Sequence, residues 1–220
     1  TIVTGNCGSG HVDVRKYLNQ IETYGVGTNV IHLLPHGALR KQVLGTTDRP
    51  PTAEEMHQMK QLARDAMEAG AWGMSTGLIY VPGAYASLEE IAEIARVIAA
   101  RNGIYASHIR NEALELLDAV NEALQIGRLA QLPVHISHFK SSQPKAWGLV
   151  RNAAELIQKA RNDGQHVTAD QYPYIASSTS LEAMLIPTDA RAGGRKAFLE
   201  RMKSLEFAAK IRRHIHNTLE

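Results

Sequence analysis

The sequence has few cysteines, no long apolar runs and little net charge, and each of these absences argues against a class of protein. Its 220 residues contain one cysteine, Cys7, which excludes an internal disulfide and is typical of a reducing compartment, so we expect a cytoplasmic location. No apolar run approaches the roughly 18 residues that a bilayer requires, so we expect no membrane span. The formal net charge is only +2, with basic and acidic side chains interleaved, which argues against nucleic acid as a main partner.

The N-terminus also lacks an initiator Met. Residues 1–3 have the composition of the inside of a strand, so we expect the natural N-terminus to lie upstream. With 44% hydrophobic and 21% charged residues the composition is that of an ordinary globular protein, long enough to bury a substantial core.

Short apolar runs alternate with longer amphipathic stretches throughout the chain. Six runs have the pattern of strands: 2–5, 29–34, 72–75, 103–108, 133–138 and 166–170. Helical periodicity covers 12–24, 52–70, 87–102, 112–131, 146–163 and 207–219. Capping boxes at Thr52 and Ser87 begin two of these helices, and we expect Gly70 and Gly103 to end them.

Five strand–helix repeats and a sixth strand predict an α/β fold with parallel strands and right-handed crossovers. No linker interrupts residues 1–220, so we expect one domain. A doubly wound sheet would carry a nucleotide-binding turn, and the glycine-rich turn at 5–10 lacks that spacing. We therefore favour a (β/α)8 barrel, of which the six strands would form an incomplete set.

Three residues with metal-binding side chains lie where predicted strands end, namely Cys7, His108 and His138. A buried Cys or His on its own is more often a packing residue than a ligand. The barrel would bring the three strand ends to one mouth, and one thiolate with two imidazoles leaves Zn²⁺ a fourth, open position. The repetition at equivalent positions makes a catalytic zinc site the first hypothesis.

Longer motifs accompany these strand ends. In chain order they are GNCG (5–8), GMSTGLIYVPG (73–83), YASHIRNE (105–112), ISHFK (136–140) and DQYPY (170–174). Their order and spacing, as far as about Pro187, resemble the N-acyl-D-amino-acid deacylases (D-aminoacylases) of the amidohydrolase superfamily. The resemblance implies zinc-dependent hydrolysis of the N-acyl amide bond of small-molecule N-acyl-D-amino acids, which gives a D-amino acid and a carboxylate.

The resemblance also implies a metal-dependent (β/α)8 barrel with one or two zinc ions. In the family the ligands are a His-x-His pair on strand one, Cys on strand two, His on strands five and six, and Asp on strand eight. Carried over by motif, Cys7, His108 and His138 are metal ligands, and the six strands are numbers two to seven. The first-strand pair and the strand-eight Asp, which is expected to act as the general acid/base, have no counterpart in these residues.

Substrate contacts are expected at the same mouth. The resemblance implies Tyr80, Lys140, Tyr172 and Ser178, with Tyr174 and Ser177 as alternatives for the last two. Lys140 lies two residues after His138, where an ammonium group can hold the substrate's carboxylate. From the sequence alone, a solvated loop lysine is an equally good interpretation of Lys140.

Other polar residues at the mouth have open roles. Arg110 and Glu112 follow His108 and could equally form an ion pair at a helix start. Asp170 ends the last predicted strand and must not be taken for the strand-eight Asp. It reads equally well as a structural carboxylate or as a residue that supports the ligands.

The remaining histidines are weaker candidates. His36 follows Pro35 at the end of the second predicted strand, and the fixed φ and missing amide donor of proline argue against a site role. Strand alternation separates His135 from His138, so His135 is a packing or supporting residue. His214 and His216 lie in a helical pattern, where residues two apart point in different directions and cannot share a metal.

Two other functions stay open. A cyclic amidase of the dihydroorotase or hydantoinase kind usually bridges its metals through a modified lysine on strand four, but residues 72–76 contain none. A truncated, non-catalytic barrel would keep the fold without the reaction. Because the His-x-His pair and the strand-eight Asp have no counterpart, we expect these 220 residues alone to be inactive.

Overall fold

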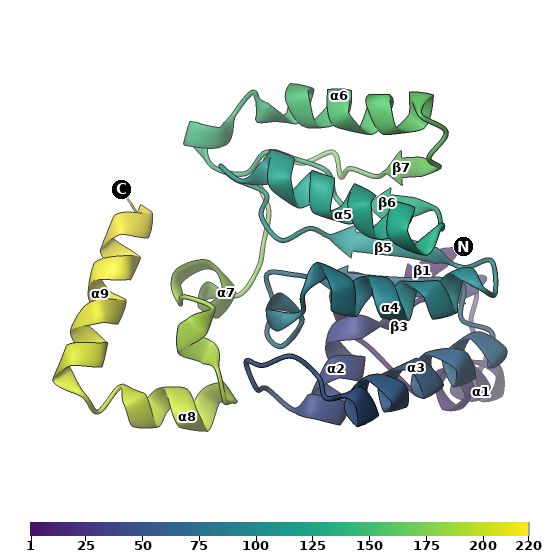
Figure 1. The fold of residues 1–220 in the computed structure, drawn as a ribbon, viewed down its shortest axis with the longest axis horizontal. Helices are drawn as coiled ribbons and strands as arrows, with labels where there is room; N and C mark the ends of the chain where they lie inside the picture. Colours follow the sequence, from purple (N-terminus) through teal and green to yellow (C-terminus); the bar gives the residue numbers. More distant parts are fainter. Residues whose placement is uncertain (220) are drawn as a thin grey trace.

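Parallel strands in chain order form the centre of the molecule (Figure 1). The structure is a computed structural model and describes residues 1–219. β1 pairs with β2, and β3 to β7 pair in sequence, every pair parallel. The strands are β1 (Ile2–Thr4), β2 (Val30–His32), β3 (Leu34–Pro35), β4 (Gly73–Gly77), β5 (Ile104–His108), β6 (Val134–Ile136) and β7 (Val167–Ala169).

The two sheets are continuous in space across Leu33, the single residue between β2 and β3. The Leu33 N–H donates to the Thr4 carbonyl at 3.0 Å, and the Trp72 N–H donates to the His32 carbonyl at 3.0 Å. Backbone hydrogen bonds therefore run from β1 to β7. All six predicted strands are confirmed, with the second one broken into two short pieces.

Helices cover one face of this strand array (Figure 1). Helices α3 to α6 contact one another in chain order, and α4, α5 and α6 also contact β5, β6 and β7 respectively. The helices are α1 (Val14–Tyr24), α2 (His36–Leu44), α3 (Ala53–Glu68), α4 (Leu88–Ala99), α5 (Leu116–Ala130), α6 (Leu149–Asn162), α7 (Leu181–Leu185), α8 (Gly194–Arg201) and α9 (Leu205–Leu219). The predicted α/β fold is confirmed, while the short helices α2, α7 and α8 were not predicted.

The predicted helix ends are partly confirmed. Thr52 forms a full capping box with Glu55 at the start of α3. Ser87 accepts the Glu90 N–H at the start of α4, but the Glu90 carboxylate turns away to Arg40, so this box is only half made. After α4 it is Asn102, with φ 56°, that adopts the left-handed conformation expected of Gly103.

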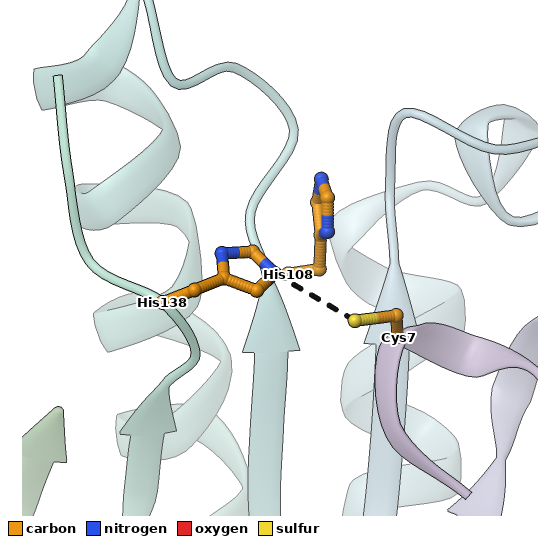
Figure 2. A group of neighbouring side chains, drawn as sticks. All are labelled: Cys7, His108 and His138. Carbon is orange, nitrogen blue, oxygen red and sulfur yellow. Dashed lines mark hydrogen bonds between the residues drawn. The ribbon is translucent and has the colours of Figure 1, made fainter. Parts of the chain in front are cut away.

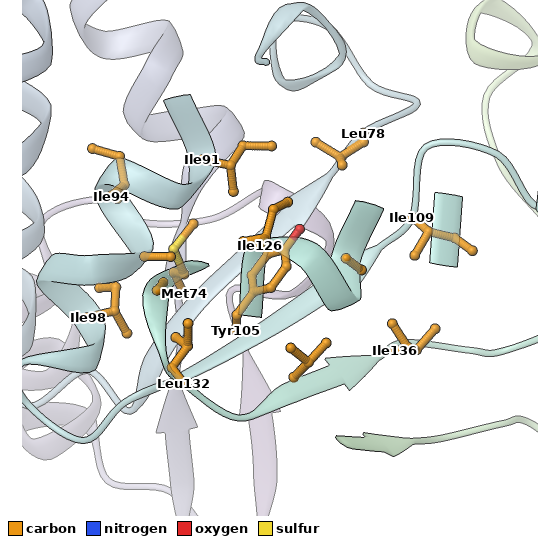
Figure 3. Packing of buried hydrophobic residues seen from close by; sticks show 14 of the residues in the cluster. Met74, Leu78, Ile91, Ile94, Ile98, Tyr105, Ile109, Ile126, Leu132 and Ile136 are labelled. Atoms are coloured by element: carbon orange, nitrogen blue, oxygen red, sulfur yellow. The ribbon is translucent and has the colours of Figure 1, made fainter. Parts of the chain in front are cut away.

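One row of side chains crosses the sheet on its helix-covered face. In register, the row is Leu34, Met74, Tyr105, Val134 and Val167, each at most 2% exposed. Figure 3 shows the middle of this core together with helix residues labelled Ile91, Ile94, Ile98 and Ile126. Burying one such side chain stabilises the fold by about 1.5–3 kcal/mol. Because this row faces the helices, the alternate residues face the opposite side of the sheet.

The opposite face leads to the site. Its row in register is Pro35, Ser75, Ala106, His135 and Thr168. β5 continues two residues past Ala106 to His108, which therefore projects from the same face at the carboxyl end of the strand.

The last helices lie apart from the strands. α7, α8 and α9 are grouped beside the sheet and its helices (Figure 1). The helix predicted at 207–219 is confirmed as α9 and contains both His214 and His216. Among the described residues no helix is both long and apolar enough to cross a membrane.

Candidate metal centre

Cys7, His108 and His138 come together at the carboxyl ends of β1, β5 and β6 (Figure 2). One potential ligand atom from each residue lies within 4.8 Å of the other two. The Cys7 Sγ is 3.6 Å from the His138 Nε2, and the two imidazole rings are 4.4 Å apart, centroid to centroid. The convergence predicted from three strand ends in distant parts of the sequence is thus present.

Cys7 is held by a tight turn, η1 (Asn6–Gly8), that packs against β4. Its backbone has φ 54°, a left-handed conformation that non-glycine residues rarely adopt. A Cβ on Gly8 would lie 2.8 Å from the Gly77 amide nitrogen, and a Cβ on Gly77 would overlap the Cys7 carbonyl. The Gly8 N–H also donates to the Ser75 Oγ at 3.0 Å. Backbone contacts therefore fix the position of the thiol.

Among residues 1–219, no group hydrogen-bonds to either ring nitrogen of His108, although its side chain is buried. Burial lowers its pKa to about 4, so the ring is neutral near pH 7. The Tyr80 ring lies against it at 5.1 Å between centroids. A buried, neutral imidazole with an unused lone pair fits a metal ligand, because a bound cation would supply the missing partner.

His138 has a polar partner on each side of its ring. Its Nδ1 is 2.9 Å from the Glu112 Oε1, opposite the nitrogen that faces Cys7. Burial alone would lower the pKa of His138, but the hydrogen bonds with Cys7 and Glu112 outweigh it and raise the pKa to about 9. The His138 backbone has φ 41°, and its N–H donates to the Asp170 carboxylate. Metal binding at Nε2 therefore requires loss of a proton.

Lys140 reaches the same carboxylate. Its Nζ lies 2.6 Å from the Glu112 Oε1, 3.1 Å from the His138 Nδ1 and 5.6 Å from the centre of the Tyr172 ring. The side chain is largely buried, so Lys140 is not a solvated loop lysine. Its charge is balanced by Glu112.

The other predicted substrate residues surround this group unevenly. The Tyr172 hydroxyl is buried and lacks a partner among the described residues, while the Tyr80 hydroxyl is 2.9 Å from the Thr179 Oγ1. Ser178 and Ser177 are exposed, and so is Tyr174, whose ring lies 6.3 Å from that of Tyr172. The structure thus brings Tyr80 and Tyr172 close to the candidate ligands and leaves the serines on the surface.

Arg110 and Glu112 do not form the ion pair considered from the sequence. Arg110 instead pairs with Glu122 at 2.8 Å and donates to the carbonyls of Ala84 and Ala86. Glu112 points to the candidate ligands, a role that no sequence pattern indicated. The two neighbours in sequence therefore serve different parts of the structure.

Asp170 and His135 support the histidine loop. The Asp170 carboxylate accepts the His138 N–H and lies 3.1 Å from the His135 Nε2. The His135 Nδ1 is 2.8 Å from the Thr168 Oγ1. Neither side chain is in the group that could hold a metal, in keeping with the supporting roles considered for them.

His36 is not at a strand end. It is the first residue of α2 and lies buried, with its Nε2 3.5 Å from the Glu90 Oε1. The strand ends one residue earlier because Pro35 acts as the N-cap of the helix. This placement agrees with the argument that His36 has no role in the site.

Comparison with curated proteins finds relatives over most of the chain. The D-aminoacylase of Alcaligenes xylosoxydans xylosoxydans is 35% identical over 205 residues, which are 83% of this chain and 42% of the relative. The N-acyl-D-glutamate deacylase of the same organism is 40% identical over 171 residues, 77% of this chain and 35% of the relative. The chain thus spans less than half the length of these relatives. No model of a protein family matches it.

A solved structure leads to the same family. The N-acyl-D-glutamate deacylase of Bordetella bronchiseptica, complexed with zinc and a phosphonate that mimics the tetrahedral intermediate, superposes with a TM-score of 0.79 at 37% identity. The match covers 86% of this chain and 44% of that one. The strand array described above is therefore part of an amidohydrolase barrel.

Proposed function

Since this chain is homologous over most of its length to the N-acyl-D-amino-acid deacylases, an enzyme family of amidohydrolases, we propose that it forms part of such an enzyme. The proposed reaction is zinc-dependent hydrolysis of the N-acyl amide bond of an N-acyl-D-amino acid. The products are a D-amino acid and a carboxylate. Residues 1–220 would form one incomplete barrel domain, with strand one and strand eight supplied by other parts of the whole protein.

One observation supports the metal site above all others. One ligand atom each from Cys7, His108 and His138 lies within 4.8 Å of the others, and the ring nitrogens of buried His108 have no hydrogen-bond partner among the described residues. A thiolate and two imidazoles are ligands that zinc prefers, and three of them leave one position open. The residues present therefore fit Zn²⁺, one or two ions per complete barrel.

Bound zinc would supply Lewis-acid polarisation of the substrate's amide carbonyl. The chain's own side chains would bind and orient the substrate. The Lys140 Nζ lies 5.6 Å from the centre of the Tyr172 ring, whose hydroxyl has no partner within the described part of the chain, and an ammonium group with a free hydroxyl suits a carboxylate. Tyr80 and Ser178 complete the proposed substrate contacts.

The proton transfers need a group that these residues do not supply. A general acid/base must take the proton of the attacking water and deliver it to the leaving amine. The family resemblance assigns this task to an Asp on strand eight. We therefore expect the 220 residues alone to turn over little or no substrate.

The cytoplasmic location predicted from the single cysteine is also part of the proposal.

The proposal is tested by assaying the full-length gene product and the 220-residue chain side by side. N-acetyl-D-amino acids are the substrates, with the N-acetyl-L enantiomers and a hydantoin as controls. We expect the full-length protein to release the D-amino acid in a zinc-dependent reaction, and the 220-residue chain to release little or none. Preference for the hydantoin would favour a cyclic amidase, although β4 has no lysine to bridge two metals. Comparable kcat/KM for both chains would contradict the assignment of the acid/base.

A further inference from the structure

Glu112 contacts two residues of the mouth with a single carboxylate oxygen. Its Oε1 lies 2.9 Å from the His138 Nδ1 and 2.6 Å from the Lys140 Nζ. The Glu112 side chain is only 13% exposed, so water does not weaken these contacts greatly. Hydrogen bonds from both neighbours hold the pKa of Glu112 below its usual value, although burial alone would raise it.

The loop on the other side of this pair keeps Glu112 in place. Both the N–H and the hydroxyl of Ser142 donate to the Glu112 carbonyl, at 2.7 and 3.0 Å. Ser142 lies two residues after Lys140, so the segment that carries Lys140 is tied to the backbone of Glu112. The Ser142 contacts therefore fix the backbone of Glu112, and its carboxylate is held by the pairs with His138 and Lys140.

His138 has two competing neighbours at Nδ1. The Lys140 Nζ is 3.1 Å from this nitrogen, and an ammonium group can only donate a hydrogen bond. A neutral imidazole that accepts at Nδ1 carries its proton on Nε2, the nitrogen that faces the Cys7 Sγ. That tautomer cannot bind a metal at Nε2. A carboxylate at Nδ1 favours the opposite, competent tautomer.

We propose that Glu112 is a positioning residue: it accepts the Nδ1–H of His138, pairs with the Lys140 ammonium, and thereby presents the lone pair of His138 Nε2 to the metal. This role rests on the metal site proposed above. It adds a residue that neither contacts the metal nor was indicated by the family motifs as a ligand. It also explains why a lysine can lie next to a ligand histidine without capturing its ring nitrogen.

The test is the zinc dissociation constant of the full-length gene product, measured by competition with a chromophoric chelator. Glu112→Ala should weaken zinc binding by about 10- to 100-fold, the range typical of residues that orient a ligand histidine. Glu112→Gln should change it only a few-fold, because the amide oxygen still accepts the Nδ1–H. The double variant Glu112→Ala/Lys140→Met should recover most of the lost affinity, because the competing donor is gone.

Glu122 provides the matched control. Its side chain is 16% exposed and also pairs with a cation, Arg110, away from the candidate ligands. Glu122→Ala should lower stability without changing the affinity for zinc. The visible spectrum of the Co²⁺-loaded full-length protein gives a second readout. Glu112→Ala should lose the intense bands of a four-coordinate site with a thiolate ligand, and Glu112→Gln should keep them.

The outcomes separate the two proposals. If Glu112→Ala changed neither the zinc affinity nor the Co²⁺ spectrum, the proposed role of Glu112 would be wrong, whereas the proposed metal site would be unaffected. The role of Glu112 would also be overturned if Glu122→Ala lost as much zinc affinity as Glu112→Ala. It would be overturned too if the double variant Glu112→Ala/Lys140→Met recovered none of the lost zinc affinity. A wild-type full-length protein that binds no zinc would overturn both proposals.

Discussion

Two groups of side chains in this molecule have nearly the same chemistry and different surroundings. The buried cluster consists of His36, Arg40 and Glu90, and the mouth cluster of Glu112, His138 and Lys140. In each, one carboxylate oxygen lies within 3.5 Å of an imidazole nitrogen and within 2.8 Å of a cationic nitrogen. In the buried cluster the side chains are 0–3% exposed, whereas in the mouth cluster they are 13–20% exposed.

The difference lies in what the rest of each group contacts. Arg40 also donates to the carbonyls of Thr47 and Arg49, so the buried cluster links helices α2 and α4 to the loop between α2 and α3. In the mouth cluster the second ring nitrogen of His138 faces the Cys7 thiol. The same carboxylate–imidazole–cation set therefore stabilises the fold in one place and prepares a ligand in the other.

The largest expected effect is a loss of stability when the carboxylate of the buried cluster is removed. Glu90→Ala should lower the free energy of unfolding by about 3–5 kcal/mol, because it leaves the Arg40 charge buried and unpaired. Urea denaturation measures this loss, and the zinc dissociation constant should stay the same. The double variant Arg40→Met/Glu90→Leu is the control and should be less destabilised than the single one. Equal losses in the two variants would contradict the explanation.

Removal of the thiol should affect the mouth alone. Cys7→Ala should raise the zinc dissociation constant at least about 100-fold, or about 2.7 kcal/mol, because it removes the softest ligand. Unfolding in the absence of metal should change little. His135→Ala is the control, since His135 contacts Asp170 and Thr168 but is not in the ligand group. Unchanged zinc content in the Cys7 variant would exclude the site.

Lys140→Ala should weaken the use of substrate rather than the binding of metal. In the full-length protein we expect kcat/KM for N-acetyl-D-amino acids to fall about 10-fold through a higher KM, with zinc content unchanged. Lys159→Ala, which removes an exposed lysine of α6 that pairs with Asp163, is the control. Parallel loss of zinc and activity would instead place Lys140 among the residues that support the metal.

The smallest expected effect is the pH dependence of the buried cluster. Burial alone would raise the pKa of Glu90, but His36 and Arg40 outweigh it and hold the pKa below its usual value. The stability that this ionised carboxylate contributes is therefore present above pH about 4.5 and is lost as the pH falls through the lowered folded-state value. The stability difference between wild type and Glu90→Gln, measured in urea from pH 6 to pH 3, should shrink with falling pH. A constant difference would show that the ionisation of Glu90 does not matter.

Periodicity was sufficient to predict the regular elements. All six strands and the longer helices follow from apolar spacing, because alternate residues of each must face a common core. The break at Leu33 and the helix that begins at His36 were missed. A two-residue strand followed at once by a nine-residue helix is too short for either period to appear.

The candidate site divides in the same way. Cys7, His108 and His138 could be predicted because each ends a strand, and parallel strands bring their ends together. The role of Glu112 could not, because it depends on how the loop after β5 folds back over the loop after β6. A third case is Asn102, which takes the left-handed position expected of Gly103. The Gly103 position instead lacks room for a Cβ beside Ile98.

The turn that carries Cys7 has a consequence for protein design. A Cβ on Gly37 would lie 2.8 Å from the Gly8 carbonyl oxygen, in addition to the clashes of Gly8 with Gly77 and of Gly77 with the Cys7 carbonyl. Three glycines from three separate segments thus let the backbone of η1 settle between β4 and α2. Anyone who grafts this thiol ligand onto another barrel must transplant all three bare positions with it, because a graft of Cys7 alone would carry the ligand without the space that its turn occupies.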